Sequence, residues 1–79
     1  MTWMFEVYYL PLSDPAREAR LAGIVSRRGG RLVFREAPEV DGSHNVCLTY
    51  EFASQADAAA AASEMQAAGE YVEGPYPYT

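Results

Sequence analysis

Apolar and polar residues alternate along several segments of the chain, and a period of two is typical of β-strands. Residues 3–10 are rich in aromatic and branched side chains, which suit a pleated sheet. Alternation predicts that one face of this strand carries Trp3, Phe5, Val7 and Tyr9, and the other Met4, Glu6, Tyr8 and Leu10. Further strands are predicted at residues 31–36, 45–52 and 71–73, the last of them short.

Two other segments have helical spacing and recognisable ends. Asp14 is a predicted N-cap and is followed by Pro15, whose fixed φ suits the first helical position. This helix is expected to end at the glycine pair 29–30, since glycine accepts the left-handed conformation there. The second helix is predicted to begin after Ser54, with an acid three residues later as in a capping box, and to end at Gly69.

The resulting order β-α-β-β-α-β predicts an α+β fold with a single domain spanning residues 1–79. Right-handed crossovers most simply give a four-stranded antiparallel sheet with both helices on one face, the ferredoxin-like sandwich. The helix-covered face is predicted to be lined by Phe5, Val7, Leu32, Phe34, Val46, Leu48, Tyr50, Phe52 and Val72.

The other face of this sheet is expected to mix apolar and charged side chains. Its predicted members are Met4, Tyr8, Leu10, Val33, Cys47 and Thr49, beside Glu6, Arg31, Arg35, Glu51 and Glu73. An apolar patch on so small a domain favours an interface, with half-exposed surface residues as the alternative. We therefore predict a two-fold homodimer that pairs face to face or by edge strands, with interface residues Met4, Tyr8, Leu10, Val33, Tyr76 and Tyr78.

The last six residues, 74–79, alternate proline with tyrosine after a glycine. This pattern favours an extended, polyproline-like segment. Such a segment can fold back over its own sheet, contact a second subunit, or fray as an ordinary terminus.

Charge limits the classes of partner. The chain has six arginines, no lysine and eleven acidic residues, for a net charge of −5. This balance argues against nucleic-acid and anionic-membrane partners, which need a basic surface. All the arginines lie within residues 17–35, which suggests either an anion site or a solvated helix face interleaved with acids. The apolar opening segment carries Glu6 and is too short to span a membrane, and it has no basic residues before the apolar run, as a signal peptide would.

Catalytic and metal chemistry have few candidates. The single histidine, His44, and the single cysteine, Cys47, are expected to point to different sides rather than form a catalytic pair. Glu39 and Asp41 near His44 show no recognisable metal-ligand spacing. We therefore predict no cofactor, no metal and no catalytic residue. One cysteine excludes an internal disulfide, which fits a reducing, cytoplasmic location.

Residues 14–32, which include Asp14-Pro15-Ala16-Arg17 and Arg27-Arg28-Gly29, resemble the first helix of ACT domains over about 19 residues. ACT domains share the β-α-β-β-α-β order and bind amino acids or similar effectors at paired interfaces. The resemblance implies an effector site at Asp14, Ala16 and Arg31. Ala16 stands where that family has a loop glycine, and Arg31 where asparagine is usual.

Residues 46–65 are similar to the third strand and second helix of RNA-recognition-motif domains, which stack bases on aromatics of the open face. Here the corresponding open-face positions hold Cys47 and Thr49, and Tyr50 and Phe52 are predicted to point into the core.

The main functional hypothesis is a small non-catalytic interaction or regulatory module that binds a partner protein through the open sheet face. A sensor of an amino-acid or other small anionic effector at a dimer seam is the alternative. A third hypothesis is a small enzyme of the dimeric α/β-barrel type, with Trp3, Tyr9 and Tyr50 lining a cavity.

Overall fold

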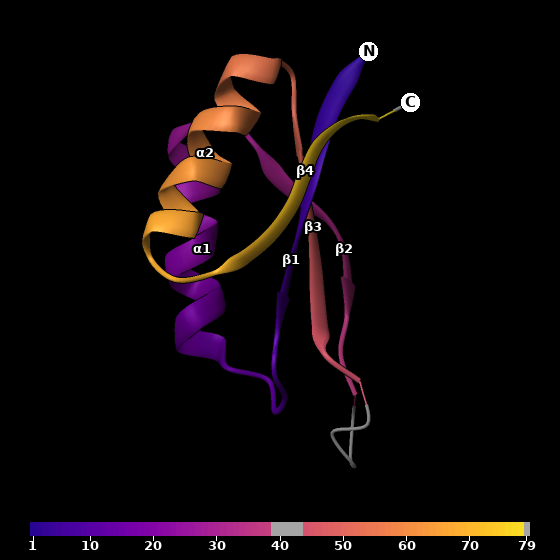
Figure 1. Cartoon of the computed structure of the whole chain (residues 1–79), viewed down its shortest axis with the longest axis vertical. Helices are drawn as coiled ribbons and strands as arrows, with labels where there is room; N and C mark the ends of the chain where they lie inside the picture. Colours follow the sequence, from indigo (N-terminus) through magenta and orange to yellow (C-terminus); the bar gives the residue numbers. More distant parts are fainter. Residues whose placement is uncertain (39–43, 79) are drawn as a thin grey trace.

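The computed structural model describes residues 1–38 and 44–78, and these form one four-stranded antiparallel sheet with two helices on one of its faces (Figure 1). The elements are β1 (Thr2–Tyr9), α1 (Pro15–Arg27), β2 (Arg31–Glu36), β3 (Val46–Phe52), α2 (Gln55–Ala67) and β4 (Tyr71–Tyr78). The strand order β2-β3-β1-β4 is that of a ferredoxin-like fold, as predicted. The predicted turn around Glu39 and Asp41 lies outside the described residues.

The helix ends confirm the predictions made from capping residues. Asp14 and Ser54 each accept a hydrogen bond from the backbone N–H three residues later, at 3.0 and 3.1 Å. Both helices end at a glycine with positive φ, 72° at Gly29 and 93° at Gly69. These four residues fix where each helix leaves and rejoins the sheet.

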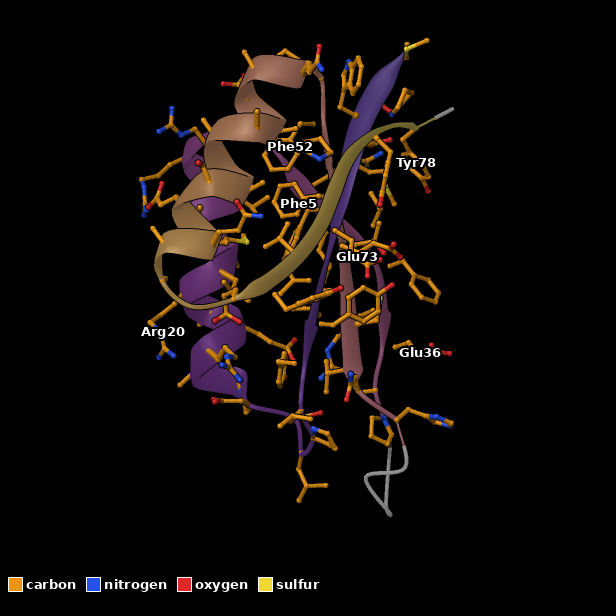
Figure 2. All side chains as sticks on the ribbon, in the orientation of Figure 1. Phe5, Arg20, Glu36, Phe52, Glu73 and Tyr78 are labelled. Carbon is orange, nitrogen blue, oxygen red and sulfur yellow. The ribbon has the colours of Figure 1, made fainter. Side chains whose placement is uncertain are left out.

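The hydrophobic core lies between the sheet and the helices. Phe5 of β1 stacks on Phe52 of β3 with ring centroids 5.3 Å apart. Both side chains point from the sheet toward α2 (Figure 2). The alanines of α2 let the helix approach the sheet closely. The buried core residues are Phe5, Val7, Tyr9, Leu21, Val25, Val46, Leu48, Tyr50, Phe52, Ala58, Ala61, Ala62 and Met65, with Val72 packed against them.

A β-bulge in β2 overturns part of the predicted core. Leu32 pairs with Tyr50, but Phe34 pairs with Thr49, so Val33 is an extra residue between them. An extra residue shifts the alternation, and this places Phe34 on the face away from the helices, 53% exposed. Leu32 stays on the helix side but is 46% exposed, because β2 is an edge strand. The prediction that these two side chains are core residues was wrong.

The same shift moves Arg35 to the helix side, where an open-face position was predicted. Its guanidinium donates to the Glu18 carboxylate on α1, at 2.8 Å from Nε and 3.0 Å from Nη2. Glu18 also accepts a hydrogen bond from the Tyr9 hydroxyl, and that hydroxyl in turn accepts one from the backbone N–H of Asp14. This cluster joins β1, α1 and β2 at one end of the helix.

The last strand is longer than the sequence pattern indicated. β4 was expected to stop at residue 73, but it continues to Tyr78 and pairs with β1 through Tyr76–Met4, Pro77–Trp3 and Tyr78–Thr2. Edge strands tolerate proline, because only one side of the strand donates to the sheet. The proline-tyrosine segment therefore completes the edge of the sheet.

Glu18→Gln is expected to make the free energy of unfolding less dependent on pH. The Arg35 guanidinium holds the pKa of the Glu18 carboxyl below its usual value of 4.5. The carboxylate therefore stabilises the fold above that value, and its contribution is lost as pH falls through the lower folded-state pKa. Urea unfolding should show a loss of about 1–3 kcal/mol at neutral pH that shrinks in acid.

The matched control is Glu64→Gln, which removes a carboxylate from an exposed ion pair with Arg27. It should change the free energy of unfolding by less than about 1 kcal/mol. An equal loss for Glu18→Gln at every pH would contradict a stabilising Glu18 carboxylate.

Candidate functional site

The open face is defined here as the face of the sheet away from the helices, and all four strands contribute side chains to it. The register places Tyr8 of β1 between Cys47 of β3 and Tyr71 of β4. Glu36, Glu73 and Tyr78 project from the side of the sheet opposite the helices (Figure 2). The open face consists of Thr2, Met4, Glu6, Tyr8, Arg31, Phe34, Glu36, Cys47, Thr49, Glu51, Tyr71, Glu73, Tyr76 and Tyr78.

Aromatic side chains are the main apolar component of the open face. Tyr71 is 61% exposed, and its ring packs edge-on against Tyr8 with centroids 6.1 Å apart. Phe34, Tyr76 and Tyr78 are also exposed. No described element of the chain covers them, because both helices lie on the other side of the sheet. Exposed rings gathered on one face of a small protein are typical of a binding surface.

The open face also carries a net negative charge. Glu6 and Glu73 lie directly opposite each other on β1 and β4, a like-charge pair. Glu36 and Glu51 add two more carboxylates, and Arg31 is the single cation in this set of residues. Four carboxylates against one guanidinium leave the described open face at −3.

Arg31 is held by its own neighbour. Its Nε and Nη2 donate to Glu51 Oε1 at 3.1 and 2.9 Å, and the Thr2 hydroxyl donates to Glu51 Oε2 at 3.0 Å. The Arg31 guanidinium and then the Thr2 hydroxyl lower the pKa of the Glu51 carboxyl. Among the described residues, no arginine forms an ion pair with the other three carboxylates of this face, Glu6, Glu36 and Glu73.

Two hollows, each of about 420 Å³, lie on either side of Tyr8. The first, the Tyr71 hollow, is lined by Tyr8, Tyr9, Leu10, Asn45, Tyr71 and Glu73. The second, the Phe34 hollow, is lined by Glu6, Tyr8, Phe34, Glu36, His44, Asn45 and Cys47. Both fall within the volume range of about 300–1000 Å³ that ligand sites occupy. Each hollow combines aromatic walls with at least one carboxylate.

The Tyr8 hydroxyl and the Cys47 thiol, which line the hollows, stay uncharged at neutral pH. Burial raises the pKa of the Tyr8 hydroxyl above its ordinary value, and the nearby Cys47, Glu6 and Glu73 raise it further. Burial is also the largest cause that raises the pKa of the Cys47 thiol, whose sulfur lies 3.8 Å from Glu6 Oε2. A thiol kept protonated is a poor nucleophile.

The structure brings together most of the predicted interface residues. Met4, Tyr8, Tyr76 and Tyr78 lie on the open face, and exposed Leu10 lines the Tyr71 hollow just beyond β1. Val33 is the extra residue of the β2 bulge.

The effector site implied by the ACT resemblance is not assembled within one chain. Asp14 caps the start of α1, and Ala16 is exposed in its first turn. Arg31 follows the other end of that 13-residue helix and binds Glu51. A helix of this length spans about 20 Å. Only a seam with a second copy could bring these residues to one ligand.

Sequence reasoning missed one wall of the Phe34 hollow. Phe34 was assigned to the core, and Glu36 and Asn45 were not singled out. Strict alternation was assumed for Arg-Leu-Val-Phe-Arg-Glu, although three apolar residues follow one another there and the segment holds neither glycine nor proline. That apolar run, and Arg35 with a charge that pairs with Glu18, were the signals of a shifted register.

His44 and Cys47 were expected to point to different sides, and this expectation was wrong, since both line the Phe34 hollow. His44 is exposed, whereas Cys47 is 9% exposed and lies beneath its neighbours. Tyr50 and Phe52 point into the core, as expected when this segment was compared with RNA-recognition-motif domains. Residues 1–38 and 44–78 contain no group of three or more potential metal ligands.

No protein-family model, curated protein or solved structure matched this chain when each set was searched. The resemblance to ACT domains therefore depends on residues 14–32 alone. In the described ranges, neither helix has both the length and the apolar character needed to cross a membrane.

Proposed function

We propose that this protein is a small non-catalytic binding module that holds a partner protein on its open face. The observation that carries the proposal is the gathering of Phe34, Tyr71, Tyr76 and Tyr78, all exposed, on one uncovered sheet face. Aromatic side chains supply most of the energy at the centres of protein interfaces. The effector-sensor alternative receives less support, because Asp14 and Arg31 lie at opposite ends of α1.

The homodimer predicted from the sequence stays a prediction, and the open face does not favour it. Face-to-face pairing of two copies would bring two surfaces of like charge together, with Glu6 and Glu73 near the centre of each. The exposed edges β2 and β4 are the alternative route to a dimer. Native mass spectrometry at several protein concentrations measures the oligomeric state.

Photocrosslinking tests the proposed binding face. A photoreactive phenylalanine analogue at position 71 is expected to capture a distinct partner in a lysate of the source cells. The same analogue at position 20, on the outer side of α1, is the matched control and should capture none (Figure 2). The captured protein, once purified, should shift amide resonances of the open face when added to ¹⁵N-labelled protein.

Leu10→Arg should weaken binding of that purified partner without unfolding the chain, because Leu10 is 77% exposed and lines the Tyr71 hollow. We expect a loss of affinity of about tenfold or more. Capture only from position 20, or resonance shifts confined to the helices, would overturn the proposed function. Capture of a second copy from position 71 would replace the partner protein with a homodimer.

A further inference from the structure

We propose that the partner presents a basic segment, and that two of its cationic side chains occupy the Tyr71 hollow and the Phe34 hollow. This inference rests on the proposed function, because it names the chemistry that the open face recognises. Two arginines separated by one residue in an extended segment are the arrangement that the two hollows fit.

The walls of the hollows suit a cation. A guanidinium or ammonium group binds favourably over the face of an aromatic ring, more strongly where water is excluded. Tyr8 and Tyr71 supply rings to one hollow, and Tyr8 and Phe34 supply rings to the other. Aromatic walls alone would accept an apolar side chain equally well, so the selectivity has to come from the charges.

Each hollow is lined by at least one carboxylate. Glu73 lines the Tyr71 hollow and accepts a hydrogen bond from the Tyr71 hydroxyl at 3.0 Å. Glu6 and Glu36 line the Phe34 hollow. A carboxylate beside an aromatic ring binds a guanidinium through charge-assisted hydrogen bonds while the ring contacts its flat surface.

The chain itself offers no extended basic segment that could fill the hollows. It has no lysine, and the one arginine of the open face, Arg31, is already held by Glu51. Arg17, Arg27 and Arg35 form ion pairs with acids of the helices or of the β4 approach. Arg20 and Arg28 are exposed, but they lie on α1 and at its C-cap rather than in an extended segment. A complementary extended basic segment must therefore come from a different molecule.

The spacing of the hollows indicates how the cations are arranged. The Tyr71 hollow is lined by residues of β4, of β1 and of the segments that follow β1 and precede β3, and the Phe34 hollow by residues of β1, β3 and β2 and of the segment that precedes β3. The two hollows adjoin, because Tyr8 and Asn45 line both of them. Alternate residues of an extended peptide project to the same side about 7 Å apart, so two of them can enter adjoining hollows together.

A synthetic peptide, Gly-Ser-Arg-Thr-Arg-Ser-Gly, tests the inference. We expect it to bind at least about tenfold more tightly than the same peptide with citrulline at both arginines, which keeps the shape but removes the charge. Fluorescence anisotropy measures both affinities, and the difference should shrink at high salt. Amide shifts should centre on Tyr8, Tyr71 and Phe34.

Matched variants separate the carboxylates of the hollows from the overall charge. Glu6→Gln combined with Glu73→Gln should lower the affinity for the arginine peptide by about tenfold. It should leave the fold intact, since it removes a like-charge pair. Glu64→Gln on α2 changes the net charge far from the hollows and should have little effect.

Any one of three results would overturn the inference. Equal binding of the citrulline peptide would show that the hollows accept side chains without regard to charge. Spermidine binding as tightly as the peptide would assign them to a small polyamine instead. Neither result would remove the proposed function, which is tested separately by crosslinking at position 71 and by the amide shifts that the captured protein causes. A protein captured there that lacks a basic segment would likewise overturn the inference alone.

Discussion

Phe52→Ala is expected to leave little of the protein folded in dilute buffer. Phe52 is 1% exposed, stacks on Phe5 and packs against the backbone at Gly30. Truncating a buried phenylalanine costs about 3–5 kcal/mol. A chain of 79 residues has a total stability of about 4–12 kcal/mol, so this loss removes a large part of it. Circular dichroism and urea unfolding measure the change.

Phe34→Ala is the matched control, because it deletes the same side chain from an exposed position on the open face. We expect it to cost less than about 1 kcal/mol. If the two substitutions destabilise equally, then Phe34 is a core residue and the bulge in β2 is wrong. Gly30→Ala probes the same packing from the other side, since its new Cβ would lie 2.4 Å from Phe52 Cε2.

The contrast between these two phenylalanines shows how far the sequence could predict the fold. Phe52 lies in a strand whose alternation is unbroken, and its burial follows directly from the period of two. Phe34 follows an extra residue, and a single insertion exchanges the faces of every later position in the strand. A bulge without glycine or proline is not marked by a residue type, so its position depends on tertiary contacts such as the Arg35–Glu18 ion pair.

The start of a helix could be predicted from its capping residue more reliably than the face of the sheet on which a strand residue lies. Asp14 and Ser54 satisfy orphan N–H groups through their own side chains, which needs no information from the rest of the fold. The second half of β4 is the opposite case. Residues 75–78 follow no strand pattern, and they extend the sheet because β1 offers an unpaired edge.

Part of the candidate site could also be predicted from local sequence patterns. Met4 and Tyr8 reach the open face through the period of two in β1, whereas Tyr76 and Tyr78 reach it because the register of β4 against β1 shifts between Met4 and Glu6. The two hollows depend on how neighbouring strands place their side chains around Tyr8, and this cannot be read from any one segment. Much of the acidic character of the face likewise appears only once β1 is paired with β4, which places Glu6 opposite Glu73.

Gly74→Ala is expected to disrupt the second half of β4. Gly74 has φ +116°, which side chains with a Cβ rarely adopt. A Cβ there would also lie 3.0 Å from Phe5 Cβ and 3.1 Å from the Met4 carbonyl oxygen. Backbone strain and overpacking each cost about 1–3 kcal/mol, so we expect a loss of about 2–5 kcal/mol in the free energy of unfolding.

Gly69→Ala separates the two causes. Gly69 also has positive φ, 93°, but its Cβ would meet nothing within 4 Å. It should therefore show the backbone cost alone, about 1–3 kcal/mol, and less than the loss for Gly74→Ala. Equal losses for the two variants would mean that the approach of β4 to Phe5 and Met4 contributes nothing.

The Gly74 substitution also divides the open face into two parts that can be measured separately. Tyr71 and Glu73 precede the glycine and line their hollow together with Tyr8. Tyr76 and Tyr78 follow it and depend on pairing with Met4 and Thr2. In the folded fraction of Gly74→Ala, amide hydrogen exchange should accelerate at Tyr76 and Tyr78 but not at Tyr71. Because binding of the arginine peptide depends on the hollows, it should persist in that fraction even though the far end of β4 is released.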